Sequence, residues 1–132
     1  MGGTGLQGIT EIQEEFRVNG VNHRIVKIIS ERIGFPDSVS AEDFASEIDK
    51  YSLNDSSYCF DMTKTGLPSA AATGVLVKFH KNHESQRGDP LSVVINSGSK
   101  LDDMLGYTRL CNQFNVWFSV GNYKKAVSYR HV

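Results

Sequence analysis

The sequence is poor in cysteine, and the two cysteines that it has do not form a recognisable pair. Cys59 and Cys111 lie far apart, and no CxxC motif is present. The pattern predicts two reduced thiols in or near the core of a cytoplasmic protein.

Long apolar runs are also missing. No run approaches the roughly 20 residues that a membrane-spanning helix needs, so membrane insertion is not predicted. The first residues, Met1-Gly-Gly-Thr-Gly5, lack the cationic flank and the apolar region of a signal peptide. We therefore expect residues 1–8 to be a flexible lead-in and residues 9–132 to form one domain.

Neither sign of charge is in excess. Fourteen Lys and Arg residues stand against fifteen Asp and Glu residues, which leaves a formal charge of −1. The chain therefore has no basic field of the kind that binds nucleic acid or an anionic membrane. With 132 residues, of which 39% are hydrophobic and 22% charged, it has the composition of a soluble globular domain with a real core.

What the sequence does contain is a regular alternation of strand and helix signals. Asn19-Gly20 predicts a tight turn between two strands, residues 9–18 (with a bulge) and 21–33, because both turn residues tolerate positive φ. A first helix is expected to begin after Ser40, which forms a capping box with Asp43, and to stop at residues 54–57. Further strands are expected over residues 58–62, 91–96 and 116–120, and further helices over residues 69–83, 100–111 and 123–129. This order predicts an α/β fold with an N-terminal β-hairpin and a mixed, mostly parallel sheet covered by helices.

The segment from Tyr58 to Val77 is the centre of the functional prediction. A buried strand is expected to end at Asp61, a surface loop to follow, and a helix with small residues in its first turn to begin at Ser69. Loops between a rigid strand and a helix often carry function, and the N–H groups of a first helical turn are a docking surface. We therefore predict a partner-contact site made of Thr63, Lys64, Thr65, Gly66, Ser69, Ala70, Ala71 and Thr73.

This segment and several later patterns resemble the STAS domain, a family named for sulfate transporters and anti-sigma factor antagonists. The family pattern is a strand ending in Asp, a short loop, and Asp-Ser-Ser-Gly-x-Gly at the start of a helix. Counted from Asp61 without a gap, Ser69 falls on the motif aspartate, Ala70 and Ala71 on its two serines, Ala72 on the first glycine and Gly74 on the second. Farther on, Leu105-Gly-Tyr-Thr-Arg109-Leu110 is similar to the family's Leu-x-x-x-Gly-Leu, with Arg109 in place of glycine. Phe114-Asn-Val116 is similar to the start of the family's last strand, and Lys124-Lys-Ala-Val127 is similar to its closing helix. The resemblance runs from about residue 24 to residue 127.

The resemblance implies a non-enzymatic regulatory protein that switches partners. In the family, a serine at this helix start is phosphorylated by a kinase of the ATP-binding anti-sigma type, and the added charge of about −1.5 to −2 changes which complex forms. Here Ala70 occupies the aligned acceptor position and cannot take a phosphate. The small run Ala70-Ala-Ala72 can serve close helix–sheet packing or simply favour the helix. Alternatively, Ala70 would fix the domain in its unphosphorylated, binding-competent form.

Three interpretations of Ser69 remain open from the sequence. It can be the helix N-cap after Pro68, accepting from the amide of Ala71 or Ala72. It can be a shifted phosphoacceptor, flanked by Thr65 and Thr73. It can also make a neutral contact with a partner.

No catalytic or metal-binding constellation is indicated elsewhere. His80 and His83 have the i, i+3 spacing that a metal could use, but the neighbouring Lys78 and Lys81 favour a structural or surface role. We expect no enzyme activity and no cofactor, since no acid, base and nucleophile can be assembled. Two other classes stay open: a structural STAS scaffold subunit of a signalling or transport complex, which would form a homo-oligomer, and a small-molecule or nucleotide-sensing module.

Overall fold

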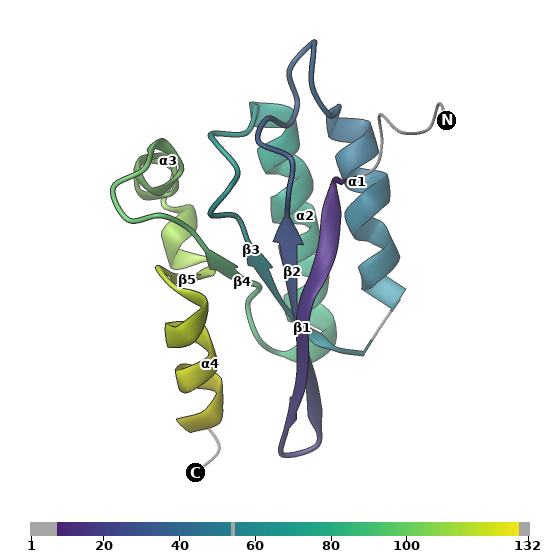
Figure 1. Cartoon of the computed structure of the whole chain (residues 1–132), viewed down its shortest axis with the longest axis vertical. Coiled ribbons are helices and arrows are strands. Elements are labelled where there is room, and N and C mark those ends of the chain that lie inside the picture. Colours follow the sequence, from purple (N-terminus) through teal and green to yellow (C-terminus); the bar gives the residue numbers. More distant parts are fainter. Residues whose placement is uncertain (1–7, 54, 130–132) are drawn as a thin grey trace.

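The computed structural model describes residues 8–53 and 55–129, which form a five-stranded sheet flanked by helices (Figure 1). The strands lie in chain order, β1-β2-β3-β4-β5; β1 pairs with β2 antiparallel and the other pairs are parallel. The strands are β1 (Thr10–Val18), β2 (Val21–Ile28), β3 (Ser57–Asp61), β4 (Ser92–Val94) and β5 (Asn115–Trp117). The helices are α1 (Ala41–Asp49), α2 (Ala70–Arg87), α3 (Lys100–Tyr107) and α4 (Val120–Tyr129), with short 3-10 turns at Lys50–Leu53 and Leu110–Asn112. The predicted α/β architecture with an N-terminal hairpin is confirmed. Of the expected lead-in, residues 1–7 lie outside the described residues.

The hairpin forms as the sequence predicts. Asn19 and Gly20 both adopt positive φ, 48° and 82°, which matches the right-handed twist of the two strands that they join. The predicted bulge lies between Ile12 and Glu14, where the pairing register shifts. The second strand ends at Ile28 and not at Ile33, because the chain there leaves the sheet and forms a single bridge from Ile33 to Val39.

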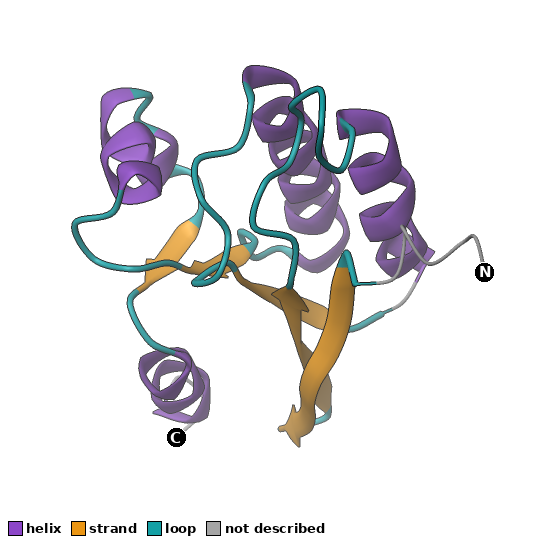
Figure 2. Ribbon diagram, turned by 45° about the horizontal axis from the view of Figure 1, so that its top comes forward, coloured by secondary structure: helices purple, strands orange, loops and turns teal. Residues whose placement is uncertain are grey.

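Helices α1, α2 and α3 cover one face of the sheet, and α4 lies against the other (Figure 2). Consecutive parallel strands joined by right-handed crossovers place their connecting helices on one face. That face holds the main core, in which Phe44, Phe60 and Leu76 are almost fully buried. The opposite face holds a smaller cluster in which Tyr123 and Val127 of α4 pack on Ile25, Cys59 and Val94.

Several element ends differ from the predicted ones. The helix expected over residues 100–111 stops at Tyr107, because Arg109 adopts a left-handed conformation with φ of 62°. The turn that follows leaves Cys111 exposed, so its expected position in or near the core is wrong, whereas Cys59 is buried as predicted. The last strand begins and ends earlier than expected, and α4 therefore starts at Val120.

Candidate functional site

The candidate site is the loop that joins β3 to α2, at the edge where the parallel strands end. Asp61 closes β3 and shapes the loop: one carboxylate oxygen accepts from the Thr63 backbone N–H (3.0 Å) and from the Thr63 hydroxyl (2.7 Å). The Asn96 side-chain amide donates to the Thr63 carbonyl (2.7 Å), so the loop after β4 supports the loop after β3. These bonds fix the first half of the loop to two neighbouring strands.

The second half of the loop is fixed to the segment that follows β2. The Thr65 hydroxyl donates to the carbonyl of Ser30 at 3.0 Å, and Gly66 N–H donates to the carbonyl of Glu31 at 2.9 Å. Ser69 N–H donates to the carbonyl of Ile33 at 3.1 Å. Because backbone and buried side-chain bonds hold it on both sides, the loop presents one defined surface.

Ser69 is the N-cap of α2, which confirms the first of its three interpretations. Its hydroxyl accepts from the Ala72 N–H at 3.1 Å, and its backbone is extended, with φ of −65° and ψ of 167°. The Thr73 N–H and hydroxyl both donate to the Ser69 carbonyl at 2.9 Å. Gly34 lies so close that a Cβ on it would be 1.9 Å from the Ser69 hydroxyl oxygen. The absence of a side chain at residue 34 therefore makes room for this cap.

The structure divides the predicted contact residues by orientation. Lys64, Gly66, Ala70 and Ala71 are exposed together, while Thr63, Ser69 and Thr73 are half-buried. Thr65 is only 7% exposed and binds backbone carbonyls, so its side chain holds the loop in place and does not face outward.

The sequence prediction omitted two residues of this surface. Leu67, in the middle of the loop, is 41% exposed, and Asn96 comes from the neighbouring loop. Leu67 could have been found from sequence, because it is an apolar residue within a polar loop. No sequence signal pointed to Asn96, because it reaches the loop only when β4 pairs beside β3.

The two helix histidines are structural. Both are buried, so of the structural and surface roles that the sequence left open, the structure shows the structural one. His83 accepts from the Tyr58 N–H through Nε2 (3.0 Å), which leaves Nδ1–H to donate to the Asp89 carbonyl (2.9 Å). His80 Nδ1 accepts from the Leu91 N–H at 3.2 Å. Burial lowers the pKa of His83 to about 4, so its imidazole is neutral at physiological pH.

The comparisons with known proteins identify the fold. No protein-family profile matches the chain, and no curated protein sequence matches it. Among solved structures, the crystal structure of an anti-sigma factor antagonist from Mycobacterium paratuberculosis superimposes with a TM-score of 0.63 at 14% sequence identity. The match covers 92% of this chain and 96% of that one. The chain has a STAS-like fold.

In this STAS-like domain the exposed first turn of α2 carries only small side chains at Ala70 and Ala71. Ala70 and Ala71 have side chains small enough for a partner's backbone to approach the first turn of α2. No group of three or more His, Cys, Asp or Glu side chains within residues 8–53 and 55–129 is arranged to hold a metal ion. In the same residues, no helix has both the length and the apolarity that crossing a bilayer requires.

Proposed function

We propose that this STAS-like domain is a non-enzymatic regulatory protein that captures an ATP-binding anti-sigma factor or serine kinase in a partner-switching system. The observation that carries the proposal is the end-to-end structural likeness to an anti-sigma factor antagonist. The contact surface would be the segment from Thr63 to Thr73, whose backbone is held rigid on both sides. Capture of the partner would release a sigma factor or another effector, and the protein would act in the cytoplasm.

We propose further that this surface is permanently in its unphosphorylated form. Ala70 and Ala71 carry no hydroxyl, and each hydroxyl in the segment has a hydrogen-bonding role. The Thr63, Thr65 and Thr73 hydroxyls donate to acceptors in the chain, and the Ser69 oxygen caps α2. A phosphate on Ser69 would also meet Gly34 and the segment around it. Phosphorylation of any of these hydroxyls would therefore remove a hydrogen bond that holds the loop or caps the helix.

A pull-down with the purified protein from its native cytosol, followed by intact-mass measurement with and without ATP, tests both proposals. Capture of an ATP-binding, kinase-like partner without a mass change supports them. A single added phosphate mapped to Ser69 or a nearby threonine would show that the switch survives at a shifted position. Recovery of only further copies of the chain, or of membrane transport components, would replace partner switching with the scaffold function.

Substitution of Ala70 by aspartate tests the position of the contact surface. A carboxylate on the exposed first turn of α2 suits the helix dipole, so the domain should stay folded. In the complex, the same carboxylate would lie against the partner and would lose its water. We therefore expect Ala70→Asp to bind the captured partner at least about tenfold more weakly than the parent protein in a calorimetric titration. Ser85→Asp, an exposed position near the other end of α2, is the matched control and should bind normally. Unchanged affinity of Ala70→Asp would remove this loop from the interface.

A further inference from the structure

A groove between α1 and α2 lies on the outer side of the main core, beside the candidate loop. It encloses about 270 Å³ and runs between Ala45, Ser46 and Asp49 of α1 and Val75, Lys78 and Asn82 of α2. Its volume is below the 300–1,000 Å³ typical of small-molecule sites, but it is large enough for one or two apolar side chains of a protein partner.

The floor of the groove is apolar. Ile48 and Phe79 close it from below, and Ala45 and Val75 are half-buried beside them. An apolar side chain laid between the helices would therefore contact carbon atoms on both sides. This is the arrangement by which a groove receives one face of an amphipathic helix.

The α1 wall of the groove carries one carboxylate, Asp49, and the helix stripe to which Asp49 belongs continues to a second, Glu42, one turn beyond the lining residue Ser46. Glu42, Ser46 and Asp49 lie on one stripe of α1 by their i, i+4, i+7 spacing, and all three are exposed. With a rise of about 1.5 Å per residue, the Glu42 and Asp49 carboxylates are spaced by roughly 10 Å along the helix axis. The opposite wall carries one charge, Lys78.

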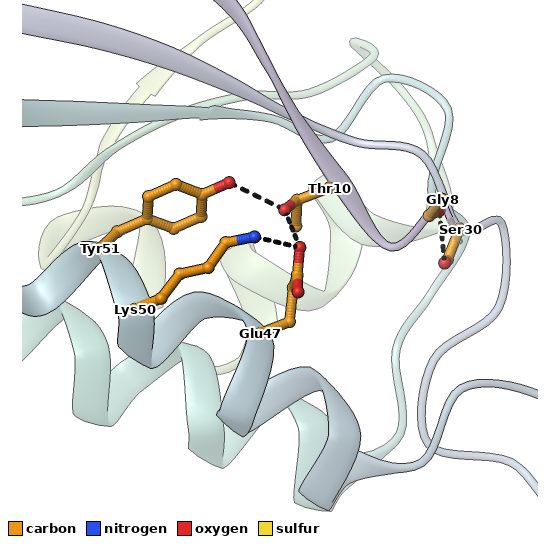
Figure 3. Close-up of polar contacts among 6 residues, drawn as sticks. All are labelled: Gly8, Thr10, Ser30, Glu47, Lys50 and Tyr51. Atoms are coloured by element: carbon orange, nitrogen blue, oxygen red, sulfur yellow. Dashed lines mark hydrogen bonds and ion pairs between the residues drawn. The ribbon is translucent and has the colours of Figure 1, made fainter. Parts of the chain in front are cut away.

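Within residues 8–53 and 55–129 these charges have no oppositely charged partner. Neither Glu42, Asp49 nor Lys78 forms an ion pair with another described residue. The Asp49 carboxylate accepts only a long bond, 3.4 Å, from the adjacent Ser52 hydroxyl. By contrast, the nearby Glu47 carboxylate has partners on another face of α1, where the Thr10 hydroxyl and the Lys50 ammonium both contact one of its oxygens (Figure 3).

We propose that this groove binds a basic amphipathic helix of a protein partner. An apolar side chain of that helix would lie on Ile48 and Phe79, and basic side chains about two turns apart would pair with Glu42 and Asp49. The groove continues from the candidate loop, since Val75 follows Ala71 by one turn on α2. A partner that covers Ala70 and Ala71 could therefore place such a helix along the groove, and in that respect the inference rests on the proposed function.

Titration of the full chain, labelled with ¹⁵N, tests the proposal. The probe is a synthetic helical peptide with two lysines seven positions apart on either side of a leucine; the control peptide has glutamates in place of the lysines. We expect amide shifts confined to the groove, at Ala45, Asp49 and Val75, and at least about tenfold weaker binding of the glutamate peptide. Absent shifts, shifts elsewhere, or equal binding of the two peptides would overturn the proposal. Shifts at these amides that depend on protein concentration without peptide would assign the groove to a second copy of the chain and would also overturn it.

Charge reversal provides the matched variants. Asp49→Lys should weaken lysine-peptide binding about tenfold, whereas Asp103→Lys, the same change on exposed α3, should not. The same two variants separate this inference from the proposed function. A captured partner that tolerates Asp49→Lys but not Ala70→Asp would refute the groove and leave the proposed function intact. Lysine-peptide binding in the groove, without capture of any kinase-like partner, would support the groove and refute the proposed function.

Discussion

Replacing Gly34 with alanine is expected to destabilise the protein through two separate effects. Gly34 has φ of +91°, a left-handed conformation that costs a residue with a Cβ about 1–2 kcal/mol. The new Cβ would also lie 1.9 Å from the Ser69 hydroxyl oxygen and 2.7 Å from the Ser69 Cβ, so one of the two segments must move. Displacing Ser69 removes the N-cap of α2, which is worth about 1 kcal/mol. The expected loss is therefore about 2–3 kcal/mol.

Gly88 offers a matched control, because it has nearly the same φ, +80°, but open space around its would-be Cβ. Gly88→Ala should cost only the conformational part, about 1–2 kcal/mol. Urea denaturation followed by the fluorescence of the single tryptophan, Trp117, measures all variants in one assay. In a double-mutant cycle, Gly34→Ala and Ser69→Ala should cost about 1 kcal/mol less together than the sum of the single changes, since the cap can be lost only once. Equal costs at residues 34 and 88, or full additivity with Ser69→Ala, would refute the close-contact argument.

Two further predictions concern residues away from the loop. Burial lowers the pKa of His83 from 6.5 to about 4 on folding. The stability that the neutral His83 imidazole gives the folded state is therefore fully present above pH 6.5 and is lost as the pH falls toward 4. We expect that loss to reach about 3 kcal/mol, measured as the difference in the pH dependence of unfolding between the parent and His83→Gln; parallel curves would contradict it. Arg109→Gly should raise the free energy of unfolding by about 0.5–1 kcal/mol, because glycine adopts the left-handed φ of 62° without the steric cost. A lower urea midpoint for this variant would mean that the Arg109 side chain makes a stabilising contact that outweighs the strain.

Much of the fold was predictable because its signals are local. Asn19-Gly20 specifies its own turn through positive φ, and Ser40 and Ser69 each cap a helix through an N–H three residues ahead. The missing glycine at residue 109 was visible as a departure from the resembled pattern, and the structure shows why glycine suits that position. The exposed residues predicted for the candidate site, Lys64, Gly66, Ala70 and Ala71, follow equally from sequence, since a loop between strand and helix lies at the surface.

The remaining features depend on which segments the tertiary structure brings together. Thr65 is turned inward because carbonyls at the end of β2, more than 30 residues earlier, need a donor there. His83 is buried because it links the start of β3 to the turn after α2, although its sequence neighbours are charged. Asp49 and Lys78 line one groove only because α1 packs beside α2. The sequence by itself determined the elements, their order, their turns and their caps, because those depend on backbone preferences over a few residues. The tertiary structure alone decided which side chains face a neighbour and which face solvent, because strand pairing and helix packing set distances between residues that are far apart in the chain.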